Sequence, residues 1–115
     1  MIRLGGITWI LTYNCNLACG HCFFDTAAGG PYLDPALVDR VLGDCPGLDG
    51  MYFQHLSGGE IFLDEERLFA VLGRIRHHYQ RTIGLSTNGF WGDSDKRASA
   101  TVARLVAAGV TGISV

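Results

Sequence analysis

The sequence predicts an α/β fold built on a parallel sheet, and two features of the chain carry this prediction. Four short β-branched or apolar segments alternate with three amphipathic segments along the 115 residues. Such alternation is typical of parallel strands joined by right-handed helical crossovers. An unusual short motif also follows each of the first three strand segments. The carboxyl ends of parallel strands meet at one edge of a sheet, where ligands usually bind.

The first predicted strand covers residues 7–12, which are β-branched, apolar or aromatic. A loop rich in glycine and cysteine follows, and then Asp34 and Pro35 indicate a helix start, with aspartate as N-cap and proline at the first helical position. We expect this helix to bury an apolar face made of Leu37, Val38, Val41 and Leu42. Residues 51–56 form the second predicted strand.

The second half of the chain repeats the pattern. Asp64 or its neighbour opens a helix that should bury Leu68, Phe69, Val71, Leu72 and Ile75. Residues 82–86 form a third strand, and Ser94 caps a third helix that Gly109 ends. The apolar side chains of that helix are Val102, Leu105 and Val106. A fourth strand is predicted over residues 110–115.

Composition excludes several classes of protein. The chain is long enough for one domain, and its 48% hydrophobic content is typical of globular proteins. A net charge of −2 without a dense basic run argues against nucleic acids and anionic membranes as partners. We find neither an apolar run of about 20 residues nor an export signal, and therefore expect a cytoplasmic protein.

Cysteines in the cytoplasm are kept reduced, so metal ligands or buried thiols are favoured over disulfides, which would require an extracellular chain. Cys15, Cys19 and Cys22 lie within eight residues. Thiolates select zinc, copper(I) or iron–sulfur clusters. A structural zinc needs a fourth ligand, whereas an iron–sulfur cluster held by three cysteines keeps one iron open for reaction. Cys45 could complete a four-cysteine site, but its predicted position at a helix end favours a buried or incidental thiol.

The pattern Cys-x3-Cys-x2-Cys after a first strand resembles the signature of the radical S-adenosylmethionine superfamily. The resemblance extends to Thr12-Tyr13-Asn14-Cys15-Asn16-Leu17, which is similar to that superfamily's lead-in. Ser57-Gly58-Gly59-Glu60 is similar to its glycine–glycine–glutamate motif, and Ser86-Thr87-Asn88-Gly89 matches a segment common after the third strand. Together these motifs span most of the chain.

The resemblance implies that Cys15, Cys19 and Cys22 hold three irons of a [4Fe–4S] cluster, whose fourth iron binds S-adenosylmethionine. An electron from a donor such as flavodoxin or ferredoxin would cleave this cofactor to methionine and a 5′-deoxyadenosyl radical, which abstracts a hydrogen atom from a substrate. The lead-in resembles those of members that modify peptides or build cofactors, so a peptide is one expected substrate.

The resemblance also suggests roles for other residues. Gly58 and Gly59 would let the backbone approach the cofactor, and Glu60 would accept hydrogen bonds from its amino group. The alternative is a tight turn with a solvated glutamate. His21 would contact the adenine, although an exposed histidine and a fourth metal ligand are competing interpretations. Asn88 could face the cofactor or the substrate, or serve the turn alone.

The superfamily's core is usually a six-unit partial (β/α) barrel of the TIM type. We therefore expect residues 1–115 to be a single domain, the N-terminal portion of such a core, truncated after the fourth strand. Two other hypotheses are a non-catalytic Cys3His zinc module and an inactive truncated fragment.

Overall fold

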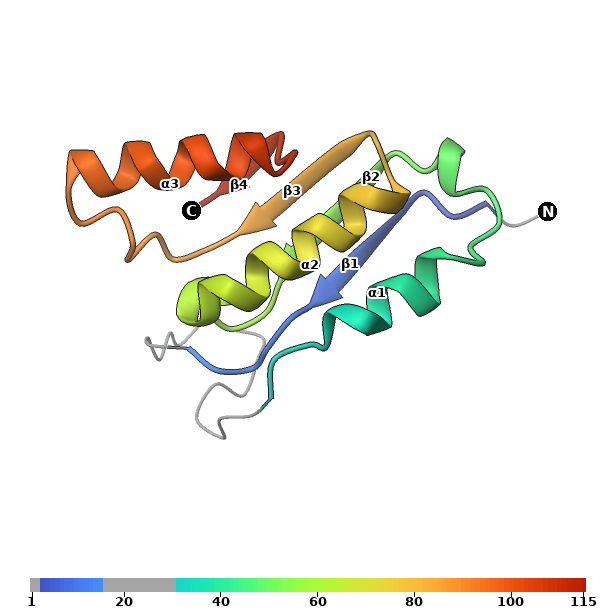
Figure 1. The fold of residues 1–115 in the computed structure, drawn as a ribbon, viewed down its shortest axis with the longest axis horizontal. Coiled ribbons are helices and arrows are strands. Elements are labelled where there is room, and N and C mark those ends of the chain that lie inside the picture. Colours follow the sequence, from blue (N-terminus) through green and yellow to red (C-terminus); the bar gives the residue numbers. More distant parts are fainter. Residues whose placement is uncertain (1–2, 16–30) are drawn as a thin grey trace.

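The computed structural model describes residues 3–15 and 31–115 (Figure 1). Four parallel strands form one sheet in the order β1-β2-β3-β4. The strands are β1 (Gly6–Ile10), β2 (Phe53–Ser57), β3 (Thr82–Ser86) and β4 (Gly112–Ser114). The helices are α1 (Pro35–Leu42), α2 (Glu65–His78) and α3 (Asp95–Ala107), with the 3-10 turns η2 (Leu48–Gly50) and η3 (Ile61–Asp64). The predicted parallel α/β architecture is confirmed, and the four strands form an open sheet.

Strand order follows chain order, so every crossover steps in the same direction across the sheet. The helices therefore gather on one face of the sheet, as Figure 1 shows for α1 and α2 in front of the strands. Trp9, Leu56 and Leu85 lie in register on three adjacent strands and are buried on the helical face. Trp9 Nε1 donates to Gln54 Oε1 at 2.7 Å, which satisfies both of these buried polar groups.

The predicted helix caps Asp34 and Ser94 are confirmed, and Asp64 is the N-cap of α2. Asp34 accepts a hydrogen bond from Ala36 N, Asp64 from Arg67 N and Ser94 from Arg97 N. Gly109 follows α3 with a φ of 96°, a left-handed conformation that favours glycine and stops the helix. The turn η3 was not predicted.

The predicted apolar faces are correct for α2 and too wide for the other two helices. Val41 of α1 is exposed, and so are Val102 and Val106 of α3, whereas Leu105 is the one side chain of α3 that is fully buried. The reason is that α3 lies at the edge of the helical layer and contacts the core through a narrow stripe. Among the helices in residues 3–15 and 31–115, none is both long and apolar enough to cross a bilayer.

The single buried residue of α3 makes its docking testable. Replacing Leu105 by alanine should lower the free energy of unfolding by about 2–5 kcal/mol, because it leaves a cavity under the helix. Val106→Ala, one residue further and 64% exposed, is the matched control and should change it by less than about 0.5 kcal/mol. Urea denaturation measures both, and equal effects of the two substitutions would contradict this packing of α3.

Candidate functional site

The segment that leads to Cys15 is attached to the end of β2. Pairing between β1 and β2 continues beyond both strands, because Leu11 N donates to Ser57 O at 3.0 Å and Gly59 N donates to Thr12 O at 2.8 Å. Glu60 N then donates to Asn14 O at 2.7 Å. The backbone is therefore fixed up to the residue before the first cysteine.

Gly58 and Gly59 make this attachment possible. Gly58 has a φ of 142°, and a Cβ at this position would overlap Thr12 O. A Cβ on Gly59 would overlap Asn14 O. The close backbone approach that the glycines predicted is thus made to the chain's own residues 12–14, and an approach to a cofactor stays a prediction.

Cys15 lies at the carboxyl edge of the sheet, half-buried, between the ends of β1 and β3. Its Sγ accepts a hydrogen bond from Asn88 Nδ2 at 3.9 Å. The structure therefore brings the first cysteine of the motif to the segment after β3, as the strand order predicted. Cys19, Cys22 and His21 lie outside the described residues.

The chain that leaves the cysteine segment is held at the same edge. Leu33 N donates to Leu11 O at 2.6 Å, and the hydroxyl of Tyr32 donates to Ile61 O at 3.0 Å. Burial raises the pKa of Tyr32 above its ordinary value, and the carboxylates of Asp64 and Glu60 raise it further. Tyr32 therefore stays protonated and remains a donor, so both flanks of residues 16–30 are attached to the segment after β2.

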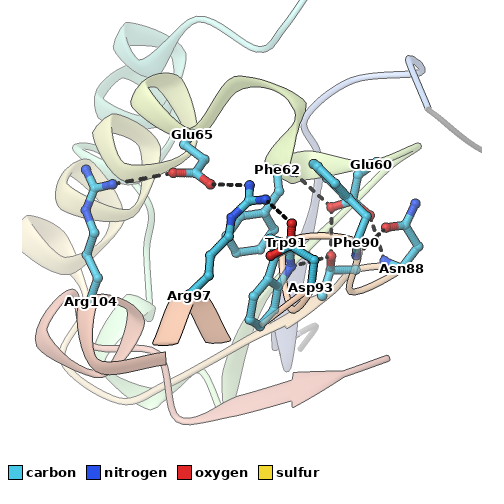
Figure 2. Close-up of polar contacts among 10 residues, drawn as sticks. Glu60, Phe62, Glu65, Asn88, Phe90, Trp91, Asp93, Arg97 and Arg104 are labelled. Atoms are coloured by element: carbon cyan, nitrogen blue, oxygen red, sulfur yellow. Dashed lines mark hydrogen bonds and ion pairs between the residues drawn. The ribbon is translucent and has the colours of Figure 1, made fainter. Parts of the chain in front are cut away.

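Glu60 is fully buried and joins the end of β2 to the end of β3 (Figure 2). Its Oε1 accepts from Thr87 Oγ1 at 2.7 Å and from Phe62 N at 3.0 Å, and its Oε2 accepts from Asn88 N at 2.6 Å. The alternative of a solvated glutamate in a turn is therefore wrong. The predicted contact with an amino group stays a prediction, and such a contact would require local opening at Oε2.

Thr87 extends this network and was not singled out from the sequence. Its hydroxyl donates to Glu60 and accepts from Trp91 Nε1 at 3.0 Å and from Gly89 N at 3.2 Å. Trp91 is buried, with its ring centroid 4.9 Å from that of Phe62. The available signal for a functional role was the position of Thr87 directly after a strand. The threonine alone does not reveal that its hydroxyl contacts the buried carboxylate of Glu60.

Figure 2 also shows how α3 is tied to α2 beside this network. Glu65 pairs with Arg97 at 4.0 Å and with Arg104 at 3.7 Å. These side chains are about half exposed, and exposed ion pairs contribute about 0–1 kcal/mol each. They orient α3, whereas the buried Leu105 carries its stability.

The sheet face away from the helices carries polar groups beneath the same edge. His55 Nε2 lies 2.9 Å from Ser86 Oγ, and both side chains are half-buried. His55 is paired with Gly84, which has no side chain, and its ring contacts Ser86 two residues further along β3. The ring of His55 therefore has a partner but lies on the sheet face away from the helical core.

The chemistry of Cys15 at this edge fits that of an iron–sulfur cluster ligand. Cys15 offers a soft sulfur that is half-buried and accepts a hydrogen bond, which is how cluster ligands are usually supported. Cys45 lies between α1 and η2, in the connection that leads to the amino end of β2, and is not at this edge. Outside residues 1–2 and 16–30, no three histidine, cysteine or acidic side chains are grouped to hold a metal.

A cavity of about 570 Å³ lies at the amino ends of the strands, away from Cys15. It is lined by Arg3, Leu4, Gly5, Pro46, Gly47, Gly50 and Tyr52. Within the described part of the chain, no titratable cluster or strand-end motif lies at this cavity, and parallel sheets bind ligands at the other edge. The carboxyl edge is therefore the better candidate site.

The glycine contacts predict opposite effects for two alanine substitutions. Gly59→Ala should lower the free energy of unfolding by about 1–3 kcal/mol, because the added methyl group displaces the backbone of residues 12–14. Gly73→Ala, on the exposed side of α2 with open space around it, should raise the free energy by about 0.5–1 kcal/mol. Denaturant titration measures both, and a neutral Gly59→Ala would argue against the close approach.

The hydroxyl of Thr87 can be tested separately from its shape. Thr87→Val should cost about 1–3 kcal/mol of unfolding free energy, because Trp91 Nε1 and Gly89 N lose their acceptor. Thr82→Val, at the exposed start of β3, is the control and should change stability by less than about 0.5 kcal/mol. Thermal denaturation of the two variants and the parent measures these effects. Similar midpoint temperatures for Thr87→Val and Thr82→Val would contradict the buried network.

Comparison with known proteins gives one informative relative. Compared with the models of known protein families, the chain matches none. It is 28% identical over 88 residues to a protein of Bacillus subtilis (strain 168) described as "Putative peptide biosynthesis protein YydG". The match covers 76% of this chain and 27% of that protein, so the chain spans about a quarter of the relative's length. The chain is thus a distant relative of a protein named for biosynthesis.

Proposed function

We propose that this chain is the part of a radical S-adenosylmethionine enzyme that binds the iron–sulfur cluster and the cofactor. One observation carries the proposal: the first cysteine of Cys15-x3-Cys19-x2-Cys22 meets both other motifs of the resemblance at one edge of the sheet. Cys15 is bonded to Asn88, and residues 12–14 are bonded to Gly59 and Glu60. Three motifs that are distant in the sequence thus converge on one place, as a shared ligand requires.

In this proposal Cys15, Cys19 and Cys22 hold the cluster, and the soft sulfur at Cys15 is the donor type it needs. The chemistry that such a cluster supplies with bound S-adenosylmethionine is reductive cleavage to methionine and a 5′-deoxyadenosyl radical that abstracts substrate hydrogen. Gly58 and Gly59 hold the first cysteine segment against β2. Oε2 of Glu60 accepts one hydrogen bond within the chain and, after local opening, can accept a second from the cofactor's amino group. His21 contacts the adenine.

The topology supports a barrel as the complete fold. Sequential parallel strands with their helices on one face are the arrangement found in (β/α) barrels, whereas doubly wound sheets reverse direction and carry helices on both faces. We therefore propose that β1 to β4 belong to a partial barrel whose interior is the face that carries His55 and Ser86. A substrate on that face would lie directly beneath Cys15.

The substrate class we favour is a peptide. Its support is the relative named for peptide biosynthesis together with the lead-in before Cys15. A reduced flavodoxin or ferredoxin is the electron donor that the proposal requires. The proposal includes neither a nucleic acid nor a membrane as a partner.

The proposal is tested by loading the protein with iron and sulfide in the absence of oxygen. We expect about four irons and four sulfides per chain, held by Cys15, Cys19 and Cys22. Cys19→Ala should lose most of this iron, and Cys45→Ala should retain it, because Cys45 lies in the connection from α1 to the amino end of β2. After chemical reduction, the loaded protein should convert S-adenosylmethionine to 5′-deoxyadenosine, measured by chromatography.

The outcomes separate the hypotheses. Stoichiometric zinc without iron would overturn the proposal in favour of a zinc module. Iron that survives Cys19→Ala but is lost in Cys45→Ala would overturn the assignment of ligands. A loaded cluster that neither binds nor cleaves S-adenosylmethionine would indicate an inactive fragment.

A further inference from the structure

We propose that Asn88 is a positioning residue for the cluster: its side-chain amide donates a hydrogen bond to the sulfur of Cys15 and raises the cluster's reduction potential. This inference rests on the proposed function, because it needs a cluster bound at Cys15. It gives Asn88 a role that neither the turn nor the substrate explains. The observation behind it is the contact of Asn88 Nδ2 with Cys15 Sγ at 3.9 Å.

The orientation of the Asn88 amide is fixed by its other end. Asn88 Oδ1 accepts a hydrogen bond from Phe90 N at 3.1 Å, and a backbone N–H can only donate. The oxygen must therefore face Phe90, which leaves the NH2 group on the side of Cys15. Since NH2 has no acceptor capacity, the sulfur is the acceptor of this hydrogen bond.

The position of Asn88 is fixed as well. Its backbone N–H donates to Glu60 Oε2 at 2.6 Å, and the preceding Thr87 is bonded to Oε1 of the same carboxylate. Two of the three hydrogen-bond donors to the Glu60 carboxylate are thus adjacent residues after β3 (Figure 2). A fully buried carboxylate resists displacement, so the amide of Asn88 is held at a constant place relative to Cys15.

The effect on the cluster follows from electrostatics. Reduction adds one electron, and part of its charge falls on the cysteine sulfurs. An N–H that points at such a sulfur stabilises the more negative, reduced state over the oxidised state. Hydrogen bonds to sulfur are among the features that set the potentials of iron–sulfur clusters. Removal of the donor should therefore make the midpoint potential more negative.

Two substitutions separate this role from that of the turn. Asn88→Ser keeps an acceptor for Phe90 N in a turn of the same kind but is too short to reach Cys15. Asn88→Asp keeps the shape and the acceptor, and replaces the donor by an anionic oxygen. Ser94→Ala is the control, because it removes the cap of α3 at the far end of the same loop without touching Cys15.

The experiment is a redox titration of the loaded full chain, followed by the paramagnetic resonance signal of the reduced cluster. At the potential where the parent is half reduced, Asn88→Ser should lower the ratio of reduced to oxidised cluster about threefold to tenfold, where tenfold corresponds to about 59 mV for one electron. Asn88→Asp should lower it further, and Ser94→Ala should leave it unchanged.

Parent-like potentials in both Asn88 variants, with iron content equal to the parent's, would overturn the inference and leave the proposed function intact. Equal shifts in Ser94→Ala and Asn88→Ser would also overturn it, because a loosened loop would then explain the change. Failure of the parent protein itself to take up a cluster would overturn the proposed function and this inference together.

Discussion

The candidate site depends on one constraint, the close approach of two backbones at the ends of β1 and β2. Residues 12–14 lie so near Gly58 and Gly59 that no side chain fits between them. Hydrogen bonds from Gly59 N and Glu60 N hold this contact. A flexible lead-in would leave the first cysteine free to move, whereas this arrangement fixes the chain at Asn14, one residue before Cys15.

The same turn that provides the glycines also provides a buried charge. Moving a carboxylate out of water is costly unless hydrogen bonds replace the lost solvent. Glu60 accepts three, from Phe62 N, Thr87 Oγ1 and Asn88 N. Because two of these donors belong to the segment after β3, the charge is satisfied only when the ends of β2 and β3 are correctly juxtaposed. Within residues 3–15 and 31–115, every buried side-chain nitrogen and oxygen has a hydrogen-bond partner.

The fold was largely predictable because local signals and topology agree. Asp34, Asp64 and Ser94 cap their helices as their positions predicted, and the apolar alternation located all four strands to within a few residues. The predicted burial of Val102 and Val106 was wrong, because helical periodicity identifies an apolar stripe but not how much of that stripe a neighbouring element covers.

The site was predictable only in outline, since strand order brings Cys15, Gly58-Gly59-Glu60 and Asn88 to one edge. What each group contacts there depends on distances between segments that are remote in the sequence. From the sequence alone, Gly59 could allow the close approach of a ligand or that of the Asn14 backbone. Thr87 likewise gives no sign that its hydroxyl meets a buried carboxylate, because that partner lies 27 residues away.

In the proposed function, Asn88 explains how two negative groups could share this edge. The carboxylate of Glu60 and a thiolate at Cys15 would repel each other in a poorly solvated place. Asn88 lies in contact with both and presents a donor to each, its backbone N–H to the carboxylate and its side-chain NH2 to the sulfur. A leucine at this position would leave the sulfur without its donor. An aspartate would add a third negative group. The asparagine therefore stabilises a concentration of negative charge that a cationic ligand, such as the amino group and sulfonium of S-adenosylmethionine, would neutralise further.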